Sequence, residues 1–356
     1  MPQNKKFIDS HWHLYSLKDK NGQDFRDVLD AFQQQSGLTA MNICSIPVYH
    51  SLGPAQNILA ALYKLHNPTA YAYAGLVYPQ CPFQKPMPEG TDPLSQYEEL
   101  MQLGFDGIKM LETKPTEQKQ YAIRIDDPYF DSFFAACEKD NTPMIWHVAD
   151  PDTFWDIDRI PKRFLDRGWF YGDGTYLSYE QTYQQVYNVL EKHPNLAVTF
   201  AHFFFLSEQP EKLEALFAKY PNVSVDITPG AEMFAAFREN HTFYRDFFAR
   251  HADRIVLGSD IYFPNSESTP LYQRLDALRR FIETEDEVKV IVENCPGLCL
   301  PEDAQEKILG GNFLKAAGDT PRSVDPKALK AYVEKYQHLI SDPQLRQGLL
   351  EEVKDF

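Results

Sequence analysis

Two histidines separated by one residue stand near the start of the chain, in the stretch Asp9-Ser10-His11-Trp12-His13. Side chains two apart on a β-strand point to the same face, so a strand here would direct both imidazoles toward one point. Neutral imidazole is a common ligand of zinc and related ions. The pair therefore indicates a metal site, provided that other parts of the chain supply further ligands.

Three more polar side chains end predicted strands: His147, His202 and Asp260. Four of the ten histidines thus fall at strand ends, where core packing explains them poorly. Asp260 follows the apolar run 255–257 and a glycine, so it would need a charged partner if it were buried. A cation shared with the histidines would supply that partner.

The elements that must position these residues are eight β-rich runs that alternate with segments of helical periodicity. The runs span residues 7–13, 40–48, 70–77, 107–111, 143–149, 196–203, 223–228 and 255–260. This pattern predicts an α/β fold, a TIM-type (β/α)8 barrel, whose reactive groups gather at the carboxyl ends of the strands. A doubly wound sheet is disfavoured, because the first run ends in histidines and not in a glycine-rich phosphate loop.

Two regions fall outside this repeat. Residues 150–178 form an unusually long insertion after the fifth strand, rich in aromatic and charged side chains, which we expect to be a lid or substrate loop. Residues 321–356 are polar and predict one or two helices packed outside the barrel as a C-terminal extension. The barrel domain would then comprise residues 1–320.

Composition restricts the partners. Acidic residues outnumber Lys and Arg by 51 to 35, for a net charge of −16, which argues against nucleic acid or an anionic membrane surface. We see no signal peptide and no apolar run of roughly 18 residues, so a cytoplasmic location is expected. Five scattered cysteines fit a reducing compartment. The expected partner is a small-molecule substrate, and the protein could also form a homo-oligomer.

Taken together, these motifs resemble the amidohydrolase superfamily, and within it the amidohydrolase-related branch that includes aminocarboxymuconate semialdehyde decarboxylase. The resemblance covers roughly residues 7–318 and rests on the order of its motifs along the chain. These motifs are His11-Trp12-His13, His147, His202, Gly258-Ser259-Asp260 and Ile308-Leu309-Gly310-Gly311-Asn312-Phe313.

The resemblance implies that His11, His13, His147 and Asp260 hold one divalent ion, Zn²⁺ in first place, with Mn²⁺ or Fe²⁺ as alternatives. It implies that His202 lies beside the ion as a polarising or proton-transferring group. Asp260 would act both as a ligand and as a proton acceptor.

Several residues are candidates for contact with substrate. Lys109 lies on the fourth strand, where binuclear relatives bridge two metals with a carbamylated lysine; contact with an acidic group or substrate is favoured, because the branch usually uses one ion. In the long loop, aromatic side chains could line the substrate site while an arginine guanidinium hydrogen-bonds a substrate carboxylate. Alternatively, the same aromatic side chains could only pack the loop on the barrel. These loop residues are Trp155, Arg163, Arg167, Trp169 and Tyr171.

Four other polar residues have less defined roles. Asp9 is expected to be a structural carboxylate or one that orients a ligand imidazole. Asp150 and Asp226 could each touch substrate or serve a structural role, and His50 follows the second strand closely enough to reach the rim of the pocket.

The sequence therefore predicts a metal-dependent hydrolase in which an ion-activated water attacks the carbonyl carbon of an amide, ester or lactone in a small carboxylate-bearing substrate. The alternative is a metal-dependent non-oxidative decarboxylase of an unsaturated or aromatic carboxylic acid. A second alternative is a binding barrel that has lost activity.

Overall fold

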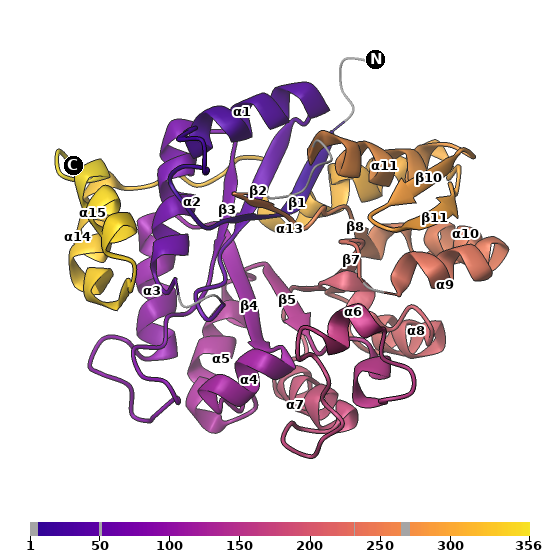
Figure 1. Ribbon diagram of the computed structural model, residues 1–356, viewed down its shortest axis with the longest axis horizontal. Helices are drawn as coiled ribbons and strands as arrows, with labels where there is room; N and C mark the ends of the chain where they lie inside the picture. The colour runs from indigo at the N-terminus through magenta and orange to yellow at the C-terminus, as the bar shows by residue number, and fades with distance from the viewer. Residues whose placement is uncertain (1–5, 50–51, 231, 265–270) are drawn as a thin grey trace.

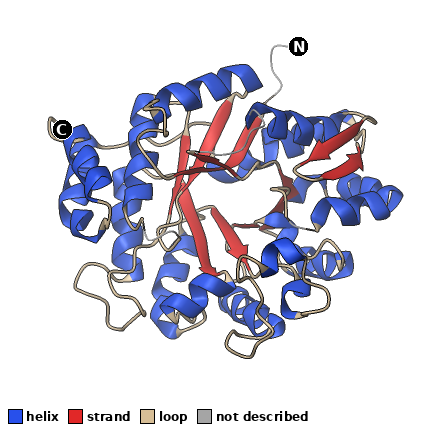
Figure 2. Ribbon diagram, in the orientation of Figure 1, coloured by secondary structure: helices blue, strands red, loops and turns tan. Residues whose placement is uncertain are grey.

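A computed structural model describes residues 6–49, 52–230, 232–264 and 271–356. Its centre is a curled parallel sheet, surrounded by helices in Figures 1 and 2. In the described part of the chain the sheet has nine strands in the order β8-β7-β6-β5-β4-β3-β2-β1-β9. Their bounds are β1 (Ile8–Leu14), β2 (Ala40–Cys44), β3 (Tyr71–Ala74), β4 (Gly107–Thr113), β5 (Met144–Val148), β6 (Val198–Phe200), β7 (Val223–Asp226), β8 (Ile255–Val256) and β9 (Ile261–Phe263). The predicted TIM-type barrel is confirmed.

The barrel closes through an interrupted eighth strand. β8 pairs with β7, and β9 pairs with β1. Between these two short strands, the amide of Ser10 donates to the carbonyl oxygen of Leu257 at 3.1 Å, and the amide of Asp260 donates to that of His11 at 3.0 Å. The prediction of one continuous strand over residues 255–260 is wrong, because the backbone turns at Asp260, whose φ is 54°.

Helices surround the sheet (Figure 1). They are α1 (Phe25–Ser36), α2 (Ala55–His66), α3 (Pro93–Leu103), α4 (Pro115–Tyr121), α5 (Asp131–Lys139), α7 (Tyr179–Lys192), α8 (Pro210–Lys219), α9 (Met233–Glu239), α10 (His241–Arg250), α11 (Leu271–Glu283), α12 (Glu302–Glu306) and α13 (Asn312–Ala317). Some of them begin with a side-chain cap, and α7 has a capping box formed by Ser178 and Gln181. The α1 helix ends at Gly37 in a left-handed conformation.

Apolar side chains fill both sides of the sheet. On the helix side, the fully buried Trp12 contacts Phe32 of α1, with ring centroids 5.2 Å apart. Inside the barrel, Tyr71 and Tyr73 of β3 meet Phe313 of α13, at 5.0 and 6.0 Å between ring centroids. This aromatic cluster belongs to the interior core, below the carboxyl ends of the strands.

Three further segments pack around the barrel. The loop 150–178 contains the 3-10 turn Asp152–Trp155 and the short helix α6 (Lys162–Leu165), around a small apolar cluster of its own. A hairpin of β10 (Glu287–Val290) and β11 (Glu293–Pro296), which the sequence did not predict, packs against α9. At the C-terminus, α14 (Pro326–Tyr336) and α15 (Pro343–Glu352) pack on α2 and α3, as Figure 1 shows in yellow.

None of the helices built from the described residues is long and apolar enough to cross a membrane.

Candidate metal centre

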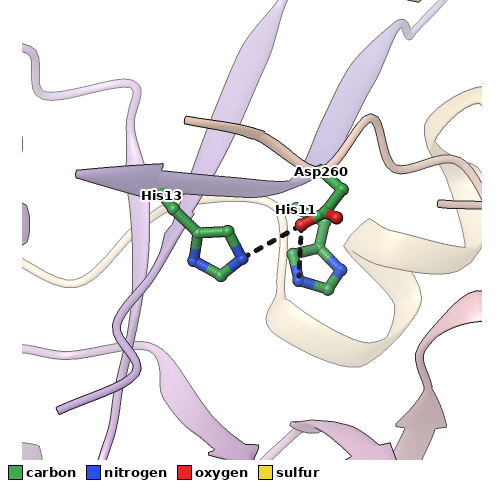
Figure 3. A group of neighbouring side chains, drawn as sticks. All are labelled: His11, His13 and Asp260. Atoms are coloured by element: carbon green, nitrogen blue, oxygen red, sulfur yellow. Dashed lines mark ion pairs between the residues drawn. The ribbon is translucent and has the colours of Figure 1, made fainter. Parts of the chain in front are cut away.

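Three predicted ligands converge at the carboxyl end of β1. Asp260 Oδ1 lies 3.2 Å from His13 Nε2 and 3.9 Å from His11 Nε2 (Figure 3). All three candidate ligand atoms lie within 4.8 Å of one another. Two imidazole nitrogens and one carboxylate oxygen are a donor set that suits zinc and similar divalent ions. Within the described residues, this is the group of side chains that fits a cation.

Local strand geometry turns both imidazoles toward the same point. The pairing of β1 with β2 shifts register between Asp9 and Trp12, which marks a bulge. Trp12 is then buried on the helix side, and His11 and His13 face Asp260. Bulges commonly re-aim side chains beside functional sites.

The Nδ1 atoms of both imidazoles already have hydrogen-bonding partners within the protein. His13 Nδ1 donates to the carbonyl oxygen of Cys44 at 2.7 Å, and His11 Nδ1 lies 2.9 Å from Asp226 Oδ2. In a neutral imidazole that donates from Nδ1, Nε2 carries the lone pair. Burial, followed by the nearby charge of Lys109, lowers the pKa of His11 to about 4. His11 is therefore neutral near pH 7, as a ligand must be.

Asp260 supplies the negative charge of this group. Burial opposes its ionisation, but the contact with His13 and the nearby His202 and His11 hold its pKa well below the usual range. Its side chain still keeps 35% of its surface accessible, whereas His11 keeps 1%. Asp260 is thus the member of the group that an incoming molecule can reach most directly.

Asp9 secures the turn that presents Asp260. Its Oδ1 accepts hydrogen bonds from the amides of Ser259 at 2.9 Å and His11 at 3.2 Å, and its Oδ2 accepts the Ser259 hydroxyl. Burial raises the pKa of Asp9 to about 7. Of the two predicted roles, a structural carboxylate or one that orients a ligand imidazole, these contacts fit the structural role, because they tie the backbone of β1 to the Ser259-Asp260 turn.

His202 lies beside the group. Its ring centroid is 6.0 Å from that of His11 and 4.8 Å from that of His147. His202 Nδ1 lies 3.2 Å from the carbonyl oxygen of Thr228, which can only accept, so Nδ1 is the donor and Nε2 the proton acceptor. Burial lowers the pKa of His202. A neutral His202 can therefore take up a proton at Nε2.

An unusual backbone presents His202. The four residues from His202 to Phe205 have φ angles of 56°, 56°, 58° and 50°, which is a left-handed turn. Each such non-glycine residue costs on the order of 1 kcal/mol, and strain of this kind is concentrated at functional sites. Tyr183 supports the turn by donating its hydroxyl to the carbonyl oxygen of Phe204 at 2.7 Å. The strand predicted over residues 196–203 is too long, because this turn ends β6 at Phe200.

His147 occupies a neighbouring position with a different orientation. Its Nε2 donates to the carbonyl oxygen of Ala149 at 2.9 Å and lies 3.7 Å from Asp150 Oδ1. Burial lowers its pKa to about 3. Among the described residues His147 is outside the three-ligand group. Its role as the fourth ligand stays a prediction, which requires donation from Nδ1 or rotation of the ring.

Lys109 projects from β4 and is 2% exposed. Burial lowers its pKa, and the groups whose charges oppose this effect include Cys44, Asp226 and Asp260. Lys109 therefore lies within electrostatic reach of the candidate centre. Neither substrate contact nor a metal bridge is tested by this placement, and both stay predictions.

The predicted lid is fastened to the barrel by a buried network. Lys114, just after β4, contacts both carboxylate oxygens of Asp150 at 2.6 and 2.8 Å. Tyr171 donates its hydroxyl to Asp150 Oδ2 at 2.7 Å. Burial opposes ionisation of Asp150, but the charge of Lys114 holds its pKa below the ordinary range. Sequence reasoning missed Lys114, whose only signal is its position shortly after the predicted strand 107–111.

The other predicted lid residues surround this network. Trp155 donates its indole N–H to the carbonyl oxygen of Leu177 at 2.8 Å, and its ring meets that of Tyr171 at 5.0 Å. The ring of Trp169 lies 4.5 Å from Lys114 Nζ. Trp155 and Tyr171 thus pack the loop, and their contact with substrate stays a prediction.

The two lid arginines have different surroundings. Arg163 lies over the ring of Phe164 at 4.7 Å, and Arg167 lies 5.5 Å from the ring of Trp169. Both are exposed, so either guanidinium can meet a dissolved anion. His50, predicted near the rim, lies outside the described residues.

Solved structures share this fold at low sequence identity. One is a 2,6-dihydroxybenzoate decarboxylase in complex with 2,6-dihydroxybenzoate, with a TM-score of 0.54, 14% identity, and coverage of 88% of this chain and 99% of that one. A candidate 2-pyrone-4,6-dicarboxylic acid hydrolase from Pseudomonas putida has a TM-score of 0.52, 14% identity, and coverage of 88% and 98%. An amidohydrolase from Burkholderia multivorans with bound zinc has a TM-score of 0.52, 12% identity, and coverage of 89% and 100%.

A search of curated proteins gave no match. The amidohydrolase family model, however, matches residues 8–315, a span that contains β1 with its two histidines, His202, and Asp260 before β9. The chain therefore belongs to the amidohydrolase family.

Proposed function

We propose that this protein is a metal-dependent hydrolase that adds water to the carbonyl carbon of an amide, ester or lactone in a small carboxylate-bearing substrate. The observation that carries the proposal is the convergence of His11 Nε2, His13 Nε2 and Asp260 Oδ1, with the neutral His202 beside them. Family membership supports an enzyme with this chemistry.

The three convergent side chains would hold one divalent ion, with His147 as the proposed fourth ligand, and Zn²⁺ suits this set of donors. When bound, the ion supplies Lewis acidity that stabilises negative charge on a reacting oxygen. Availability often decides between Zn²⁺, Mn²⁺ and Fe²⁺ at such sites.

The protein's own groups handle the protons. Asp260 is ionised and partly accessible, so it can accept a proton from the attacking water. Neutral His202 can then accept this proton from Asp260 at Nε2 and deliver it to the leaving group. Arg163 or Arg167 would attract the carboxylate of the substrate to the lid.

The direct test incubates Zn²⁺-loaded protein with panels of lactones, esters and amides that carry a carboxylate, and with unsaturated and aromatic carboxylic acids. The proposal predicts products that have gained water, with no carbon dioxide. Carbon dioxide release without addition of water would replace the hydrolase with the decarboxylase. If the protein turned over none of these compounds and failed to take up Zn²⁺ or Mn²⁺, it would be an inactive binding barrel.

A further inference from the structure

Asp226 ends β7 and is completely buried, and both of its carboxylate oxygens are occupied. Oδ2 lies 2.9 Å from His11 Nδ1. Oδ1 accepts from the amide of His202 at 2.8 Å and from the amide of Thr228 at 3.1 Å, and it also accepts the Thr228 hydroxyl. One carboxylate therefore links a candidate metal ligand on β1 to the first residue of the left-handed turn after β6.

Both oxygens of the buried Asp226 already have protein partners, whereas the sequence had left contact with substrate or a structural role open for this residue. An ionised carboxylate only accepts hydrogen bonds, so His11 must donate from Nδ1. The lone pair then lies on Nε2, which is the nitrogen nearer to Asp260.

We propose that Asp226 is a positioning residue that fixes the metal-binding tautomer of His11 and, through its other oxygen, anchors the turn that presents His202. This inference rests on the metal site of the proposed function. Carboxylates that orient ligand imidazoles commonly change metal affinity by about 10–100-fold when they are lost.

The substitution Asp226→Asn separates this role from simple packing, because it changes hydrogen-bonding capacity at nearly constant shape. An asparagine has one accepting oxygen, and three donors from two residues converge on the Oδ1 position. The amide oxygen is expected to take that position, which leaves the NH₂ group facing His11 Nδ1. His11 must then accept at Nδ1 and carry its proton on Nε2, where it blocks a metal.

The first readout is ¹⁵N NMR of the histidine rings in metal-free protein at neutral pH. Wild type should show His11 protonated at Nδ1, and Asp226→Asn should show it protonated at Nε2. If the variant kept the wild-type tautomer, the proposal would be overturned, whether or not the protein binds any metal.

The second readout is the affinity for Zn²⁺ by competition with a chromophoric chelator. Asp226→Asn should weaken binding by about 10–100-fold. The matched control is Asp106→Asn, which alters a buried carboxylate just before β4, where Asp106 pairs with Lys64 at 2.6 Å. This control should lose stability but keep its zinc affinity.

Two outcomes distinguish a failure of the role proposed for Asp226 from a failure of the proposed metal-dependent function. Equal zinc affinity in wild type and Asp226→Asn would contradict the positioning role and leave the metal site intact. A wild-type protein that does not bind zinc, together with a tautomer change in the variant, would contradict the proposed function and preserve the assignment of Asp226 as the residue that sets the His11 tautomer.

Discussion

At the residue scale, the donor and acceptor states of three ring nitrogens distinguish the roles of the histidines. His11 and His13 direct Nε2 at Asp260, whereas Nε2 of His147 donates to a main-chain carbonyl group. The sequence predicted which residue types gather at the strand ends. It could not predict ring orientation, because side-chain rotamers depend on partners such as Asp226 and Cys44 that are distant in sequence.

Replacing His13 and His202 by alanine should produce different losses. His13→Ala should abolish stoichiometric metal binding, because it removes a ligand atom. His202→Ala should retain metal and lose about 10²–10⁴-fold in turnover, the usual contribution of a general acid or base. Elemental analysis and steady-state rates measure both effects, and the exposed His66 is the control position for an alanine substitution. Metal loss in His202→Ala, or full metal content in His13→Ala, would reverse these assignments.

The raised pKa of Asp9 predicts a pH effect on stability. Its pKa is about 7 in the folded protein and 3.8 in the absence of burial, so the folded state binds the extra proton between these values. Its stabilising contribution is therefore complete below pH 3.8 and declines as pH rises toward 7.

The variant Asp9→Asn lacks this titration. Relative to wild type, its free energy of unfolding should improve by about 2–3 kcal/mol between pH 5 and pH 8. Guanidinium unfolding of both metal-free proteins at the two pH values measures the change. A difference between the proteins that does not vary with pH would show that Asp9 does not titrate in this way.

At the scale of elements, the sequence predicted the alternation of strands and helices but not the interruptions that shape the site. The left-handed turn after β6 carries three phenylalanines, and left-handed backbone is normally signalled by glycine or asparagine. The split between β8 and β9 likewise depends on a positive φ at Asp260. In both places tertiary contacts override local preference, and both lie at the candidate centre.

The attachment of the lid should depend on Lys114. Lys114→Met leaves the buried Asp150 without its cation, which should cost about 3–5 kcal/mol of unfolding free energy. Lys162→Met is the matched control, because Lys162 and Asp166 form an exposed pair within the same loop. Its effect should be close to zero. Equal urea midpoints for the two variants would show that the Lys114–Asp150 pair does not hold the loop.

At the scale of the whole molecule, the candidate catalytic residues and the residues of the interior core occupy different parts of the barrel. The candidate ligands lie at the carboxyl ends of the strands, as expected for this architecture. The aromatic cluster of Tyr71, Tyr73 and Phe313 instead fills the interior of the barrel. The sequence predicted this overall arrangement, because buried parallel strands have a strong apolar signal.

Phe313→Ala should therefore destabilise the protein without affecting metal. Removing this buried ring should cost about 3–5 kcal/mol of unfolding free energy. Zinc affinity should remain that of wild type, because Phe313 contacts the tyrosines of β3 and none of the candidate ligands. Denaturant unfolding and chelator competition on the same samples measure the two quantities. A parallel loss of zinc affinity would show that the interior core and the metal centre are coupled.

The most direct test of the central claim is a crystal structure of the zinc-loaded protein with anomalous data at the zinc edge. The account predicts one anomalous peak about 2.0–2.2 Å from His11 Nε2, His13 Nε2 and an Asp260 carboxylate oxygen. Zinc bound at other residues, or no peak between these three side chains in saturated crystals, would contradict it.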